Sequence, residues 1–135
     1  MNTPAHAVIA AYYAAFNEGD IPAFLNLLTY DVRHDINQSG TETGRQAFAA
    51  FLQEMNRCYK ETITDIVIFT DASGTRAAAE FMVQGEYLHA QEGLPPARNQ
   101  KYTLPAGAFF TLRNGKISRI SNYYNLPDWL AQVGK

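Results

Sequence analysis

Asp35 and His34 are adjacent residues whose side chains could take up a proton at a functional site. A carboxylate in an apolar pocket has a raised pKa, so Asp35 could act as a general base near neutral pH. Imidazole titrates near neutral pH unaided, so His34 could be the base instead or could orient a ligand. The competing interpretations are an exposed aspartate and a structural histidine. Val32, His34 and Ile36 are the more apolar set here, so strand alternation points Asp35 away from the core unless a bulge or a polar pocket intervenes.

Other polar side chains could contact a ligand in the same place. Tyr12 could donate a hydrogen bond to a substrate oxygen, or it could be a core aromatic residue. We predict that five further residues line the site, four of them with polar side chains: Asn37, Tyr87, Ala108, Asn122 and Tyr124.

The sequence offers no metal or cofactor motif. His6, His34 and His89 lie on different predicted elements, and neither His-x-x-x-His nor a paired cysteine spacing occurs. A glycine-rich phosphate loop, a nucleophile elbow and a dinucleotide fingerprint are also lacking, so we expect no organic cofactor. Cys58 is the only cysteine, which excludes an internal disulfide. We expect it to be a buried spectator, and the cytoplasm as its compartment.

Length and composition predict one domain over residues 1–135, since 47% of the residues are hydrophobic and the chain has room for one core. The net charge is -2, with both signs scattered, so neither nucleic-acid binding nor a charged tail is expected. The longest apolar stretches are too short to span a membrane, and the first residues do not resemble a secretion signal.

The predicted elements are two helices, a strand, a third helix and four mainly antiparallel strands. Thr3-Pro4 opens the first helix, Gly19 ends it, and Asp20 caps a second helix that extends to Leu28. Thr43 and Gln46 read as a capping box for a third helix that reaches Tyr59. The expected strands are 32–37, 63–69, 76–89, 99–113 and 117–124, and a short helix follows at 126–133. This order is typical of an α+β fold with helices on one face of the sheet.

Alternation along the long strands separates an apolar face from a polar one. Odd positions of 76–89 and even positions of 99–113 are apolar, and several are small, such as Ala79, Gly85, Ala106 and Ala108. Small residues on a sheet that curves over helices leave room for an apolar pocket, unless helix side chains fill it. The last strand is ambiguous between its two faces.

An ordered set of motifs gives the chain a family resemblance. The motifs are Tyr12 with Gly19-Asp20, 31–35, 44–48, 93–96, 113–117 and Tyr123-Tyr124-Asn125. In this order they resemble the nuclear transport factor 2-like superfamily, in particular its ketosteroid isomerase and SnoaL-like polyketide cyclase branch. The resemblance implies a cone-like, curved, mainly antiparallel sheet wrapped around the N-terminal helices and enclosing an apolar pocket. It also implies a homodimer that forms through the outer face of the sheet.

The resemblance assigns roles to particular positions. It implies a base at Asp35 and a hydrogen-bonding tyrosine at Tyr12, while the family's third acidic position falls on Ala108. Alanine cannot donate a hydrogen bond, and Asn125, where related cyclases often carry an acid, cannot be a base.

Two functions follow as hypotheses. The first is a cofactor-free isomerase or cyclase that abstracts a proton from a small apolar carbonyl compound, with Asp35 or His34 as the base. The alternative is a non-catalytic module that binds a small hydrophobic ligand, which Ala108 and Asn125 favour.

Overall fold

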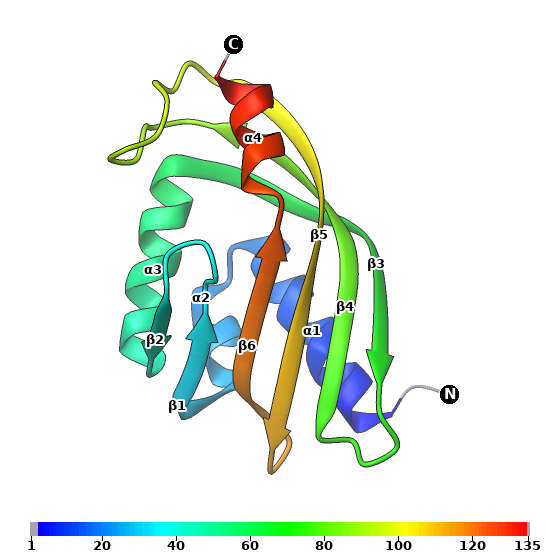
Figure 1. Cartoon of the computed structure of the whole chain (residues 1–135). Coiled ribbons are helices and arrows are strands. Elements are labelled where there is room, and N and C mark those ends of the chain that lie inside the picture. The colour runs from blue at the N-terminus through cyan, green and yellow to red at the C-terminus, as the bar shows by residue number, and fades with distance from the viewer. Residues whose placement is uncertain (1–2, 135) are drawn as a thin grey trace.

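The computed structural model describes residues 3–134 and consists of a curved sheet backed by helices (Figure 1). The helices are α1 (Pro4–Glu18), α2 (Ile21–Asn26), α3 (Arg45–Cys58) and α4 (Leu126–Val133). The strands are β1 (Leu28–Asp35), β2 (Thr41–Thr43), β3 (Tyr59–Thr70), β4 (Arg76–Tyr87), β5 (Gln100–Arg113) and β6 (Lys116–Tyr124). None of the helices described over this range is long and apolar enough to cross a membrane.

The six strands form one open sheet in the order β2-β1-β6-β5-β4-β3. Neighbouring strands pair antiparallel except β1 and β6, which pair in parallel. Figure 1 shows α1 and α2 behind the sheet, α3 beside the β1–β2 edge and α4 at the end of β6. The predicted α+β class and the mainly antiparallel, curved sheet are confirmed.

The first two helices begin where the sequence places them. Thr3 Oγ1 accepts a hydrogen bond from the His6 amide at 3.1 Å, and Asp20 Oδ1 accepts one from the Ala23 amide at 3.1 Å. Gly19 ends α1 with φ at +69°, a conformation that glycine adopts at little cost. Gly19 and the Asp20 cap therefore set the turn that carries the chain from α1 into α2.

Several boundaries differ from the sequence prediction, and three of these differences involve helices. The prediction of a capping box at Thr43 is wrong. Helix α3 begins at Arg45, after Gly44 (φ +99°), and has no side-chain cap. Thr43 instead ends β2, a strand that the sequence did not predict. Tyr59 opens β3 rather than closing a helix. Leu28 belongs to β1 and not to the second helix, because β6 pairs with it. Sheet pairing overrides helix propensity at these positions.

The inner faces of β4 and β5 agree with the alternation argument. The register places Ala79 opposite Ala108 and Val83 opposite Leu104, and all four are buried on the helix side. On β6, Asn122 and Tyr124 line the cavity on this inner face. The core thus lies between the helices and the concave face of the sheet.

Candidate functional site

A cavity of about 690 Å³ opens between the helices and the concave face of the sheet. Its size is in the range of small-molecule sites. Aromatic and aliphatic side chains form most of its wall, among them Phe16, Phe51, Leu104 and Trp129. The expected apolar pocket is therefore present in the structure, and the helix side chains do not fill it.

His34 is the most deeply buried polar group at the wall, with 1% of its surface exposed. Its ring stacks on Phe48, with ring centroids 4.2 Å apart and an interplanar angle of 11°, and meets the edge of Phe51 at 4.8 Å. Nδ2 of Asn122 donates to Nε2 of His34 over 3.1 Å. The imidazole is thus held in one orientation by two aromatic rings of α3 and one amide of β6.

Glu42 lies on the other side of the His34 ring. Pairing of β1 with β2 places the two residues directly opposite each other, and Oε1 of Glu42 is 3.8 Å from Nδ1 of His34. Both atoms are buried, and neither has a hydrogen-bond partner among the described residues. Because Nε2 accepts from Asn122, the ring proton belongs on Nδ1, which faces this carboxylate.

Burial determines the charge of His34. Removal from water lowers the pKa of His34 to about 4, and the nearby charge of Asp35 offsets only part of this effect. The imidazole is therefore neutral at pH 7. A neutral imidazole keeps a lone pair that can accept a proton, which is the property that a general base needs.

Asp35 does not line the cavity, so its expected placement there is wrong. Its carboxylate is on the outer side of the sheet, 2.8 Å from Nε of Arg33 and 3.0 Å from Nε of Arg119, and it accepts a hydrogen bond from Thr41 at 3.1 Å. Burial alone would raise its pKa, but the bonds from Arg33 and Thr41 and the two guanidinium charges hold the pKa of Asp35 below its usual range. Strand alternation gives the reason, since His34 faces inward.

Two tyrosines of α1 border the cavity. Tyr12, a predicted site residue, packs on Phe24 with ring centroids 4.4 Å apart. Tyr13 is its neighbour, and its buried hydroxyl has no hydrogen-bond partner within residues 3–134. Burial raises the pKa of both phenols, so both stay protonated and can donate. The family resemblance implies a role for Tyr12 alone, whereas helical spacing marks both tyrosines as core.

The predicted ligand-binding residues divide into two groups. Asn122 and Tyr124 line the cavity. Asn37 does not, because its amide donates to Ser121 Oγ at 3.0 Å and to the Asn122 carbonyl at 2.7 Å. The hydroxyl of Tyr87 donates to the Pro95 carbonyl at 2.7 Å, which fastens the 91–98 loop. Ala108 is buried on β5, where Leu104, Ala106 and Gly107 form the cavity wall instead.

Glu42 and Glu61 also line the cavity, although the sequence did not predict them as site residues. Glu42 is on the short strand β2, which had no hydrophobic pattern to reveal it. Glu61 is at the beginning of β3, before the strand that the sequence predicted, and its carboxylate accepts a hydrogen bond from Tyr102. Its position two residues before Ile63, an inward-facing residue, was the available signal.

No group of three or more His, Cys, Asp or Glu side chains over residues 3–134 could hold a metal ion. The absence of a cofactor remains a prediction.

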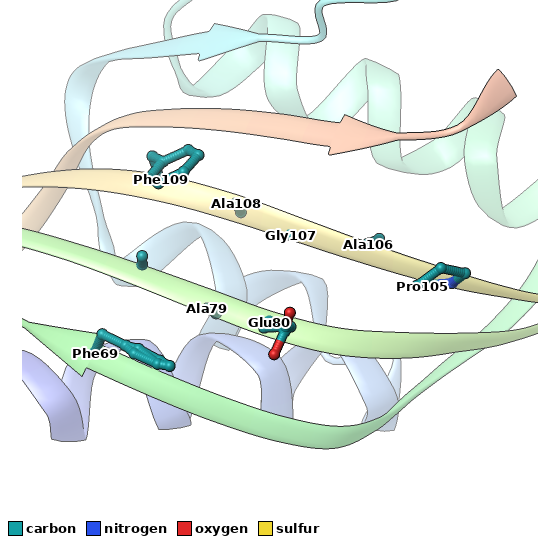
Figure 2. Close-up of a pocket in the computed structure, with 9 residues that line it drawn as sticks. Phe69, Ala79, Glu80, Pro105, Ala106, Gly107, Ala108 and Phe109 are labelled. Atoms are coloured by element: carbon teal, nitrogen blue, oxygen red, sulfur yellow. The ribbon is translucent and has the colours of Figure 1, made fainter.

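A second, shallower hollow of about 430 Å³ lies on the outer face of the sheet (Figure 2). Figure 2 shows Phe69, Glu80, Pro105 and Phe109 projecting from β3, β4 and β5 on the side away from the helices. Phe69 and Phe109 are each about half exposed. This hollow is separate from the inner cavity and is a surface feature.

Solved structures of close relatives share the whole fold. A candidate polyketide cyclase from Pseudomonas putida KT2440 is 58% identical, with a TM-score of 0.94 and 98% of each chain covered. Another from Xanthomonas campestris pv. campestris is 52% identical, with a TM-score of 0.93 and 96% of each chain covered. A Catenulispora acidiphila protein with a ketosteroid isomerase-like fold is 20% identical, covers 94% of this chain and 92% of its own, and has a TM-score of 0.77, which shows the fold alone.

None of the curated proteins matches this chain. Residues 9–120 match the SnoaL-like domain family, a span that includes most of α1, the β1–β2 hairpin, α3 and most of the curved sheet. The fold, the cavity and this match agree, and the chain belongs to the SnoaL-like domain family.

Proposed function

We propose that this chain is a cofactor-free enzyme that moves a proton on a small, largely apolar carbonyl compound, with His34 as the base. The observation that carries the proposal is the neutral, buried imidazole at the wall of an apolar cavity. The close relatives named as candidate polyketide cyclases support cyclisation or isomerisation as the reaction class.

In the proposed step, Nε2 of His34 removes a proton from the carbon beside the carbonyl. The C–H bond breaks, an N–H bond forms, and the electron pair moves onto the carbonyl oxygen to give an enolate. The substrate displaces the amide of Asn122 from Nε2, while the Glu42 carboxylate stabilises the imidazolium from the Nδ1 side. With a β,γ-unsaturated ketone the enolate is conjugated and takes the proton from Nε2 back at the γ-carbon, which is isomerisation. Alternatively, the enolate carbon attacks a second carbonyl carbon and the resulting alkoxide takes the proton from Nε2, which is cyclisation.

Tyr12 and Tyr13 are the proposed donors to the enolate oxygen. Both line the cavity, and the free, buried hydroxyl of Tyr13 would gain its missing hydrogen bond when a ligand oxygen arrives. This pair takes the place of the family's acidic donor, which Ala108 cannot supply.

Exchange of the α-hydrogens of enolisable ketones for deuterium, followed by proton NMR, tests the first half of the reaction directly. The variant His34→Gln is expected to slow exchange by about 10²- to 10⁴-fold, the usual contribution of a general base. His89→Gln is the matched control because His89 is exposed. Exchange at the wild-type rate in a folded His34→Gln protein would remove His34 from the mechanism.

The alternative proposal is a binding module without catalysis. Asn125, where related cyclases often carry an acid, caps α4, since its Oδ1 accepts from the Asp128 amide at 3.1 Å. Ligands that raise the melting temperature without any deuterium exchange would favour this alternative, because binding to the folded state stabilises it.

We also propose that a second copy of the chain covers the outer face of the sheet. Four large apolar side chains are exposed there, and exposed apolar patches mark protein contacts: Val67, Phe69, Phe109 and Tyr123. Light scattering at micromolar concentration is expected to give the mass of a dimer, and a monomer there would contradict the proposal. The cytoplasmic location stays a prediction.

A further inference from the structure

Two hydrogen-bonded side chains, with a glycine between them, lie on adjacent strands at the end of the cavity near α4. Glu61 on β3, Gly85 on β4 and Tyr102 on β5 lie directly opposite one another in the sheet. The Tyr102 hydroxyl donates to Oε2 of Glu61 over 2.5 Å, so the phenol crosses β4 to reach β3. Glu61 also lines the cavity, so its carboxyl group is available to a ligand.

Gly85 makes this crossing possible. A Cβ atom at this position would lie 2.2 Å from Cζ of Tyr102 and 2.5 Å from its hydroxyl oxygen. Any other residue would push the phenol away from β4. Gly85 does not have a positive φ, so the need for glycine here comes from the Tyr102 ring.

The surroundings of Glu61 provide no compensating positive charge. The cavity wall includes four glutamates, Glu42, Glu54, Glu61 and Glu92, and no lysine or arginine from the described part of the chain lines it. Three phenols from β3, β5 and β6 lie near Glu61, those of Tyr59, Tyr102 and Tyr124. The indole of Trp129 on α4 packs against the Tyr102 ring, with ring centroids 6.0 Å apart. Burial raises the pKa of Glu61, and the hydrogen bond from Tyr102 offsets part of that rise.

We propose that Glu61, held by Tyr102, is a second ligand anchor, where its protonated carboxyl donates a hydrogen bond to a neutral oxygen of the ligand. A ketone, ester or hydroxyl oxygen fits this donor, whereas a carboxylate or phosphate meets four acidic groups and no cation. Tyr102 is six positions along β5 from Ala108, the residue opposite Asn122, which is about 20 Å at 3.3 Å per residue. Glu61 and His34 therefore lie at different ends of the same cavity, and we expect a ligand that reaches both to be elongated.

This inference rests on the proposed function because it assigns the ligand of the same cavity. The probe is para,para′-diacetylbiphenyl, and its matched control carries an isopropyl group in place of one acetyl group. Calorimetry is expected to show that the diketone binds about tenfold more tightly to the wild type and to Glu61→Gln, since glutamine keeps a donor. In Glu61→Leu the two compounds are expected to bind equally.

The proposal is overturned if the tenfold difference persists in Glu61→Leu, or if neither compound binds to the wild type. It is also overturned if the biphenyl analogue with a carboxylate or an aminomethyl group in place of one acetyl group binds more tightly than the diketone. These analogues would show an anion site or a cation site instead.

Infrared difference spectra provide a readout that needs no ligand. A carboxylic acid band at neutral pH that disappears in Glu61→Gln is expected, and an ionised Glu61 in the wild type would overturn the proposal. Failure of the proposed function is distinguishable, because a diketone that binds through Glu61 but never exchanges its α-hydrogens contradicts only the role of His34. Exchange that is normal while Glu61→Leu has no effect on binding contradicts only the anchor.

Discussion

Acid is expected to destabilise this protein through His34 by an amount that can be measured. The folded-state pKa of His34 is about 4, against about 6.5 for an exposed histidine. Between these values the unfolded chain binds a proton that the folded chain does not, so the free energy of unfolding decreases as the pH decreases from about 6.5 toward 4. At about 1.4 kcal/mol per pKa unit, this difference in pKa lowers the free energy of unfolding by about 3 kcal/mol in total. About 2 kcal/mol of this decrease occurs between pH 7 and pH 5.

Urea unfolding followed by circular dichroism, at pH 7 and at pH 5, measures this effect. Asp31 and Asp35, whose pKa values are lowered in the folded state, also lose stabilising interactions in acid, but they do so equally in every variant. Between pH 7 and pH 5, the free energy of unfolding of His34→Gln is therefore expected to decrease by about 2 kcal/mol less than that of the wild type. The decrease in the exposed control, His89→Gln, is expected to equal that of the wild type. Equal losses in His34→Gln and the wild type, or an NMR titration of His34 with its midpoint near 6.5, would refute the reasoning.

Three further changes test separate parts of the structure. Gly85→Ala is expected to lower the free energy of unfolding by about 1–3 kcal/mol in a denaturant titration, because its Cβ overlaps the Tyr102 ring. In a Tyr102→Ala background the same change is expected to leave the free energy of unfolding unchanged, and an equal decrease there would contradict the clash. Asp35→Asn is expected to leave deuterium exchange unchanged while lowering stability by about 1 kcal/mol; a hundredfold slower exchange would return Asp35 to the catalytic site. Phe109→Glu is expected to convert a dimer to a monomer in light scattering, and an unchanged mass would place the contact elsewhere.

Strand alternation predicted more of the site than the family resemblance did. The resemblance assigned the base to Asp35, whereas alternation pointed His34 inward and Asp35 outward. The structure agrees with alternation because β1 pairs in regular register with β2 and β6 from Arg33 to Asp35, without a bulge that could turn the carboxylate. Strand alternation therefore predicts the direction of a side chain correctly where the strand pairs with its neighbours in regular register.

The same rule could not find Glu42, and for Glu61 it could give the inward direction but not the partner. Alternation needs a strand that is long enough to show two faces, and β2 has three residues, so Glu42 looks like a loop residue in the sequence. The partnership of Glu61 with Tyr102 depends on the order of three strands and on the missing side chain of Gly85. These are properties of tertiary pairing, which residue types and spacing do not reveal.

The charges of the cavity connect the two proposals. An enolate is an anion, and the described wall of this cavity contains four glutamates and no lysine or arginine to stabilise it. Such a wall favours proton abstraction only if hydrogen-bond donors replace cations and if the carboxyl groups do not all carry charge. Tyr12 and Tyr13 provide donors, a neutral His34 provides the base, and a protonated Glu61 removes one negative charge while anchoring the far end of the ligand. An enzyme of this kind is expected to lose ligand affinity once the pH is high enough to ionise Glu61, before the tyrosines of α1 lose their protons.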